Sequence, residues 1–136
     1  MREAQIQTLF SKSIRKDRNA VYELKLEKGK SMPFNKVAEH QLIALKQAKD
    51  GGLFHKLTDM PHFAGMKARF DKPRPFDCLT VYKVESYIGI CFYEPRKPKE
   101  VILIDIDDFT DEMSWAKRKS LMKERAVEIA TRTIRI

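Results

Sequence analysis

The segment from Ser86 to Tyr93, SYIGICFY, is apolar at both alternating sets of positions. Successive side chains of a strand point to opposite faces of a sheet, so both faces of this strand need to be covered. We therefore expect it at the centre of a sheet with a packing layer on each side. A second strong strand, EVILIDI from Glu100 to Ile106, follows a basic, proline-bearing tip.

Weaker strand patterns lie on either side of this pair. The segment Phe76 to Lys83, FDCLTVYK, is separated from the central strand only by Val84-Glu85, which predicts a β-hairpin between the two. LFHKLT, from Leu53 to Thr58, alternates well enough for another strand. The final TRTIRI alternates isoleucine with arginine and predicts either an edge strand or an arm on a partner.

Two amphipathic helices precede the long apolar strands. From Arg2 to Lys16, apolar residues recur at helical spacing, and from Asn35 to Lys49 a second stripe follows a possible N-cap at Asn35. A later helix is expected after Asp107, with Ser120 as a possible N-cap. The order predicts one α/β domain over residues 1–136, a mixed, twisted sheet covered by the first two helices. We expect its main strands to be those that contain Glu23, Asp77 and Cys91.

Composition narrows the class of protein. With 136 residues, 43% hydrophobic content and a formal charge of +8, the chain is long enough for a real core and attracts polyanions. Nucleic acid is the favoured partner, although an acidic membrane surface would exert the same attraction. No apolar run approaches a membrane span, and the charged start MREAQIQ is not a secretion signal. We expect a cytoplasmic protein without a membrane partner.

The two cysteines, Cys78 and Cys91, lie on separate apolar strand patterns. They have neither CxxC spacing nor a nearby cluster of histidines, so they support neither a zinc site nor a disulfide framework. We interpret both as small core residues.

The strand VYELKLE, from Val21 to Glu27, carries the first candidate chemistry. Alternation places Glu23, Lys25 and Glu27 on one face and apolar side chains on the other. A carboxylate beside an ammonium can hold a divalent cation with the first and orient a water or phosphate with the second, as in a nuclease. The alternative is a solvated strand face with alternating charges.

Further polar residues stand at defined points of the predicted elements. Gln41 falls one helical turn after Val37 and tends toward the buried side, where its amide needs partners, whereas His40 is expected to be exposed. Glu3, in a first helical turn, suits the helix dipole. Asp77 either caps a turn or faces a metal ion.

Basic residues gather in two connections. The turn RKDRN contains Arg15 and Lys16, and the long connection from 59 to 74 interleaves basic with aromatic residues. That connection predicts either a nucleic-acid groove or a flap over the sheet. The candidate nucleic-acid contacts in the two connections are Arg15, Lys16, Lys67, Arg69, Lys72 and Arg74.

Taken together, four segments carry a resemblance to a known family: Glu3 on the first helix, the YELK strand, SMPFNKVAEHQ leading into a helix, and KPRPFDCL. Their order resembles the PD-(D/E)XK nuclease superfamily, and within it the Holliday-junction resolvases. In those enzymes the E-x-K strand is followed by a segment of the type sFPL…HQ, which MPF…EHQ resembles. The likeness covers most of the chain, and it is the combination of motifs that makes it specific.

The resemblance implies a restriction-endonuclease-like fold and a Mg²⁺ site, with Mn²⁺ as an alternative. Glu23 and Asp77 would bind the metal with the Leu24 carbonyl, and Glu3 would bind or orient a metal-bound water. Lys25 would position the nucleophile or stabilise charge at phosphorus, and Gln41 would support these groups.

The chain departs from the family pattern at one metal ligand. The family's metal-binding aspartate normally precedes the E-x-K strand, where this chain has only Asp17, in a basic turn. Asp77, after Pro75-Phe76 on a later strand, resembles a migrated version of this aspartate, so the resemblance implies Asp77 as the ligand, with Asp17 as its alternative.

The implied function is metal-dependent hydrolysis of DNA phosphodiesters at four-way (Holliday) junctions. A resolving enzyme makes two related incisions, so a symmetric homodimer is expected, with Ile134 and Ile136 available for the interface. The alternatives are a different DNA nuclease of the superfamily, a non-catalytic nucleic-acid-binding protein on the same scaffold, and a structural or interaction protein whose charge confers solubility.

Overall fold

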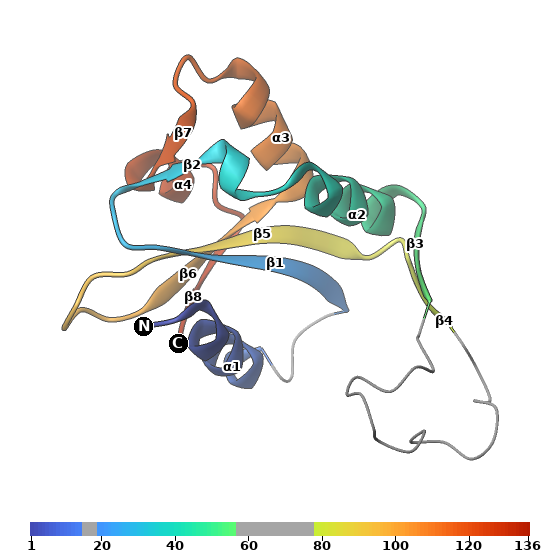
Figure 1. Ribbon diagram of the computed structural model, residues 1–136, viewed down its shortest axis with the longest axis horizontal. Helices are drawn as coiled ribbons and strands as arrows, with labels where there is room; N and C mark the ends of the chain where they lie inside the picture. The colour runs from blue at the N-terminus through green and yellow to red at the C-terminus, as the bar shows by residue number, and fades with distance from the viewer. Residues whose placement is uncertain (15–18, 57–77) are drawn as a thin grey trace, which may run out of the picture.

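The computed structural model describes residues 1–14, 19–56 and 78–136 (Figure 1). The central sheet has the strand order β1-β5-β6-β8, with β1 parallel to β5 and the other neighbours antiparallel. It is a mixed sheet flanked by helices, as predicted. In chain order the elements are α1 Glu3–Ser13, β1 Ala20–Glu27, β2 Ser31–Pro33, a 3-10 turn Phe34–Lys36, α2 Glu39–Asp50, β3 Gly52–Lys56, β4 Cys78–Tyr82, β5 Glu85–Phe92, β6 Glu100–Asp105, α3 Ile106–Trp115, β7 Ser120–Met122, α4 Lys123–Glu128 and β8 Arg132–Arg135.

Strand β5 lies between β1 and β6, which confirms the prediction of a central strand. Its residues from Ser86 to Phe92 are all buried. Gly89 is required by close packing against β1, because a Cβ atom there would lie 2.5 Å from Cδ2 of Leu24 and 3.0 Å from Cγ1 of Val101. A side chain at this position would displace neighbours on the face that α1 covers.

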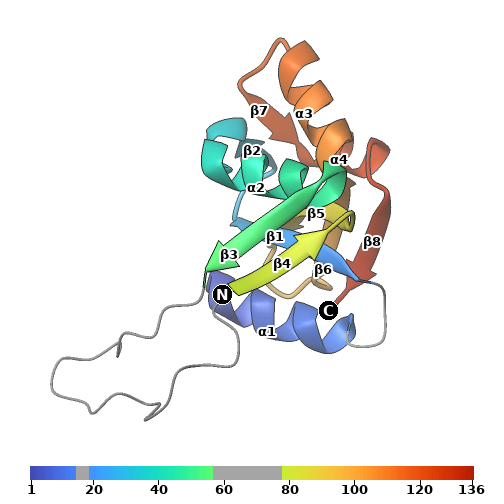
Figure 2. The same cartoon turned by 90° about the vertical axis from the view of Figure 1, so that its right-hand side faces the viewer.

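Helices lie on both faces of the sheet (Figure 2), and each face has its own apolar cluster. On the α1 face, Ile6 and Phe10 pack against Leu24, and the rings of Phe10 and Tyr22 meet edge to face at 5.0 Å. On the opposite face, α2 and α3 contribute Leu45 and Phe109 to a second cluster. The two layers explain why β5 has to be apolar on both sides.

Strands β3 and β4 form a separate two-stranded ribbon with Gly52 opposite Tyr82. The predicted hairpin between β4 and β5 is therefore wrong, and β4 is not a strand of the central sheet. Lys83 has a positive φ of 47°, and the amides of Lys83 and Val84 bond to carbonyls of Gly51 and Ala48 at the end of α2. The chain thus leaves the ribbon at Lys83, so β5 is free to pair with β1 and β6 at the centre of the sheet, where helices cover both of its faces.

Two predicted helix starts also need correction. The chain from Phe34 to Lys36 is a 3-10 turn, and α2 begins only at Glu39 with Ala38 as its N-cap, so Asn35 does not cap it. Ser120 begins β7 and is not an N-cap, because β7 pairs with β2 and brings Leu121 opposite Met32, both buried.

The C-terminal segment forms β8, an edge strand paired with β6, which confirms one of the two predictions for it. Ile134 is only 8% exposed and belongs to the α1-side cluster, and Ile136 packs partly against it. The prediction that Ile134 is available for a dimer interface is therefore wrong, since folding already buries it.

Cys91 is a buried core residue as predicted, and burial raises the pKa of its thiol. The side chain of Cys78 lies outside the described side chains. None of the helices in the described ranges is long and apolar enough to cross a membrane.

Candidate active site

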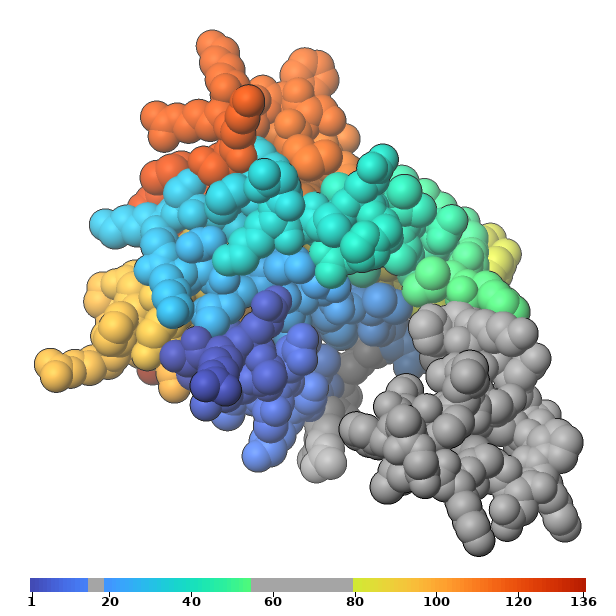
Figure 3. Space-filling model, in the orientation of Figure 1, coloured from blue at the N-terminus to red at the C-terminus, as the bar shows by residue number. Residues whose placement is uncertain are grey.

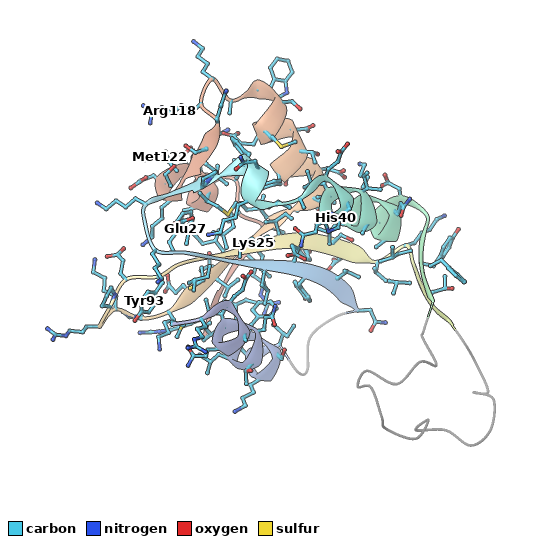
Figure 4. The ribbon with its side chains drawn as sticks, in the orientation of Figure 1. Lys25, Glu27, His40, Tyr93, Arg118 and Met122 are labelled. Atoms are coloured by element: carbon cyan, nitrogen blue, oxygen red, sulfur yellow. The ribbon has the colours of Figure 1, made fainter. Side chains whose placement is uncertain are left out.

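Strand β1 turns its alternate side chains to the two faces of the sheet. Leu24 enters the α1-side cluster, so its neighbours Glu23 and Lys25 point to the α2 side. The parallel pairing with β5 fixes this register, with Glu23 opposite Ile88 and Lys25 opposite Ile90. The charged pair therefore stands on a rigid strand directly beneath the start of α2 (Figure 4).

Glu23, Lys25 and Gln41 form a closed hydrogen-bonded triangle, which we call the E-K-Q triangle. The Lys25 ammonium lies 2.8 Å from Oε1 of Glu23 and donates to Oε1 of Gln41 at 3.1 Å. The Gln41 amide donates through Nε2 to the same Glu23 oxygen at 2.8 Å. Each member of the triangle thus fixes the other two.

The start of α2 holds Gln41 in place. The backbone N–H of Ala38, the N-cap, donates to Oε1 of Gln41 at 3.0 Å. The Oε1 atom of Gln41 therefore pairs with a backbone amide at the helix start that would otherwise have no partner. The same oxygen accepts from Lys25, and Nε2 donates to Glu23, so Gln41 joins the helix to the strand. This confirms that Gln41 lies toward the buried side and that its amide has partners, while neighbouring His40 is exposed.

Lys25 is the one charged residue that is buried among the described residues, at 9% exposed, and the Glu23 side chain is 26% exposed. The alternative of a solvated charged strand face is therefore wrong for this pair. Taking an ammonium out of water is costly, and apolar side chains of similar size often serve stability as well or better. Stability alone gives no reason for a lysine at this position.

The two oxygens of the Glu23 carboxylate differ in their contacts. Both the ammonium and the amide contact Oε1, and within the described residues Oε2 accepts no hydrogen bond. A fixed, partly exposed carboxylate oxygen fits Mg²⁺ or Mn²⁺, which prefer hard oxygen ligands. The described residues contain no group of three or more His, Cys, Asp or Glu side chains that could hold a metal ion. Further ligands would have to come from backbone carbonyls, water, DNA or the remaining residues.

A second acid–base pair closes the polar face of β1, and the sequence analysis did not identify its lysine. Lys36, in the 3-10 turn, donates to the Leu26 carbonyl at 2.5 Å and to Oε2 of Glu27 at 3.0 Å. Burial alone would raise the pKa of Glu27, but Lys36 and the amides of Lys28 and Gly29 together lower it. The signal for Lys36 was weak, because only the second carboxylate of the strand, Glu27, indicated that a cationic partner was needed.

The other predicted site residues are not part of the E-K-Q triangle. Glu3 is an exposed residue in the first turn of α1, and α1 covers the opposite face of the sheet. The Leu24 side chain is in the core, which leaves only its carbonyl as a candidate ligand. The remaining candidates all lie outside the described residues: Asp17, Asp77, Arg15, Lys16, Lys67, Arg69, Lys72 and Arg74.

Comparisons with family models, with curated proteins and with solved structures gave no match.

Proposed function

We propose that the protein is a metal-dependent DNA endonuclease of the PD-(D/E)XK type with a restriction-endonuclease-like fold. The observation that carries the proposal is the E-K-Q triangle, in which a buried lysine is held between a carboxylate and an amide. The same residues are those that the resemblance assigns to the E-x-K strand and to the HQ segment. A buried ammonium next to an open carboxylate oxygen suits reaction at a phosphate better than it suits stability.

In this proposal Glu23 binds Mg²⁺ or Mn²⁺ through Oε2, with Asp77 and the Leu24 carbonyl as further ligands. Glu3, on the helix that covers the opposite face of the sheet, takes no part in this site. The bound cation would polarise the phosphoryl oxygens and favour deprotonation of the attacking water. The Asp77 assignment rests on the resemblance, with Asp17 as its alternative.

Lys25 supplies a positive charge that is shielded from water and held in position by its ion pair with Glu23. Its ammonium has two acceptors in the triangle and can donate a third hydrogen bond. Directed at a phosphate oxygen, that bond stabilises the extra negative charge that develops during in-line attack. Gln41 keeps the ammonium and the Glu23 carboxylate in fixed positions, so little reorganisation is needed.

The proposed substrate is a four-way DNA junction cut by a homodimer. The charge of +8 favours a polyanion, and two-fold symmetry would place two identical sites on a nearly two-fold symmetric junction. With Ile134 buried, the dimer interface would have to use other surfaces. The second candidate is a non-catalytic DNA-binding protein on the same scaffold, which is motivated by the departure of the metal-binding aspartate from the family pattern.

A digest of junction, flap and plain duplex DNA tests the proposal, with Mg²⁺, Mn²⁺ or a chelator present and the molecular mass measured by light scattering. We expect paired incisions in the junction, dependence on the metal, and a dimer. Cleavage of all three DNAs alike by a monomer would point to another nuclease of the superfamily. Binding without cleavage under every metal condition would favour the non-catalytic candidate.

A further inference from the structure

An exposed tryptophan and a run of cations stand together at the C-terminal end of α3. Trp115, the single tryptophan of the chain, is 84% exposed. Ala116 follows it, and then come Lys117, Arg118 and Lys119, all exposed, before β7 begins at Ser120. We call Trp115 and the three cations the α3–β7 surface. It projects from the molecule at the top of Figure 3, in orange.

The backbone under this surface is fixed at both ends. The amide of Ala116 donates to the Glu112 carbonyl at 2.8 Å, and the Glu112 carboxylate takes two bonds from Arg125 of α4, at 3.0 and 2.9 Å. At the other end, the Lys119 carbonyl accepts from the Phe34 amide at 3.1 Å. The surface is therefore held in position before any ligand binds, which reduces the entropy cost of binding.

The three cations of the α3–β7 surface are available to bind a ligand. Among the described residues, Lys117, Arg118 and Lys119 form no ion pair. Four lysines of the neighbouring elements, Lys36, Lys46, Lys49 and Lys123, do pair with carboxylates, whereas Lys28 and Lys30 in the β1–β2 connection are exposed like the three cations. Cations just after a helix can offset its dipole, but that effect fades within a turn and gives no reason for an exposed indole beside them.

An exposed indole next to three cations is complementary to single-stranded or branched DNA, which presents unpaired bases and phosphates. A base stacks on the indole, and lysine or arginine binds the phosphates on either side. The exposed carboxylates of Asp108 and Asp111, two turns and one turn before the end of α3, repel phosphate. DNA is therefore expected to bind at the C-terminal end of α3, next to Trp115.

This surface is linked to the E-K-Q triangle through short, rigid connections. Lys119 bonds to Phe34 at the start of the 3-10 turn, and Ala38, just after that turn, bonds to Gln41 of the triangle. Figure 4 shows Arg118 on the same side of the sheet as Lys25, directed away from the core. DNA held on the surface would thus run over the face that carries the triangle.

We propose that Trp115 stacks on a base exposed at a DNA branch point while Lys117, Arg118 and Lys119 hold the neighbouring phosphates. The inference rests on the proposed function only in that DNA is the ligand, and not on cleavage. Because Trp115 is the only tryptophan, its fluorescence reports on this surface alone.

The experiment titrates the full-length protein, in chelator, with a four-way junction, a single strand and a plain duplex. Binding is measured by anisotropy of dye-labelled DNA, and contact at Trp115 by its quenching and its protection from acrylamide. We expect quenching and protection with the junction and the single strand, and much less of both with the duplex. Trp115→Ala should weaken junction binding by about tenfold, and Trp115→Phe should restore most of it.

The cations are tested by the triple variant Lys117→Gln, Arg118→Gln, Lys119→Gln. It should lower the dependence of log affinity on log salt concentration by about two to three units. A matched variant removes the same charge from the β5–β6 turn, by Arg96→Gln, Lys97→Gln and Lys99→Gln, and should change that slope less. Val127→Ala, at an exposed apolar residue of α4, controls for Trp115→Ala.

The outcomes separate this surface from the proposed enzyme. DNA binding that leaves Trp115 fully accessible to acrylamide overturns the surface while the proposed endonuclease stands. Trp115 protection without cleavage in any metal supports the surface and counts against the enzyme. No DNA binding at low salt, or a fluorescence change with anionic vesicles and none with DNA, overturns the surface.

Discussion

The two faces of strand β1 are built from the same backbone but differ in what they bury. On the α1 face, Leu24 packs among apolar side chains and Phe10 meets Tyr22 edge to face. On the α2 face, two residues of the same strand bury an ammonium and part of a carboxylate beneath Gln41. The first arrangement lowers the free energy of the fold by removing apolar surface from water, whereas the second costs desolvation.

This difference separates residues that stabilise the fold from those expected to act on a ligand. If the comparison is right, substitutions on the α1 face change the free energy of unfolding, and substitutions in the E-K-Q triangle change activity while the fold persists.

The largest effect is expected for Glu23→Gln. It keeps the size of the side chain and a hydrogen-bond acceptor but removes the charge that would bind the metal, so cleavage should fall on the order of 10³-fold. DNA binding should persist or tighten, because a negative charge near phosphate is lost. Single-turnover cleavage and anisotropy measure the two. The matched control is Glu39→Gln, at an exposed residue of α2. Full cleavage activity in the Glu23→Gln variant would show that Glu23 is not part of the active site.

The sharpest contrast comes from adjacent residues of β1. Leu24→Ala should cost about 2–4 kcal/mol in the free energy of unfolding, because it leaves a cavity under α1. Lys25→Met should abolish cleavage, but alone it leaves the partly buried Glu23 carboxylate without its cation. The double variant Glu23→Gln, Lys25→Met replaces the whole pair and should leave the free energy of unfolding unchanged or raise it by about 1 kcal/mol. Urea unfolding followed by circular dichroism gives both values. Strong destabilisation by the double variant would show that the buried ion pair serves the fold.

Gln41→Met should have a smaller, mixed effect. It removes one acceptor from Lys25, one donor to Glu23 and the cap of the Ala38 amide. We expect cleavage to fall by about 10- to 100-fold and the free energy of unfolding by about 1 kcal/mol. His40→Ala, one residue away and exposed, is the control. An equal loss in both variants would mean that the helix start matters and the triangle does not.

The smallest effect is a pH dependence confined to the α2 side. Hydrogen bonds from Lys46 and then Lys49 hold the pKa of Asp107 below its ordinary value of 3.8. A lowered folded-state pKa means that these contacts stabilise the fold above that value and are lost as pH falls through the lowered one. Stability should therefore drop more steeply below pH 3.8 in the wild type than in Asp107→Asn. Parallel curves would show that this link between α2 and α3 contributes nothing.

Sequence patterns were reliable for what each segment buries. The central position of β5, the amphipathic helix α1 and the face shared by Glu23 and Lys25 all follow from side-chain alternation or helical spacing. The inclination of Gln41 toward the core followed from its place between Val37 and Leu45. These are local properties, because the direction of a side chain depends on its own backbone.

The sequence predicted less well which distant segments pack or pair with each other. The pairing of β4 with β3, the pairing of Ser120 with Pro33 and the burial of Ile134 all depend on which distant segments compete for the same edge. The pattern around each of them fits more than one partner, and only the packed molecule selects one. The same holds for Lys36, whose bond to Glu27 joins residues separated by a turn.

By itself, the sequence determined which residues could form a site: a carboxylate and an ammonium on one face of a strand, and an amide on the next helix. Only the tertiary structure decided that Lys25 is buried and that Gln41 meets both charges, because α2 must first pack on that face of the sheet. Burial is a property of the whole packed chain. It turns a pattern that also fits a solvated surface into a preorganised group of charges.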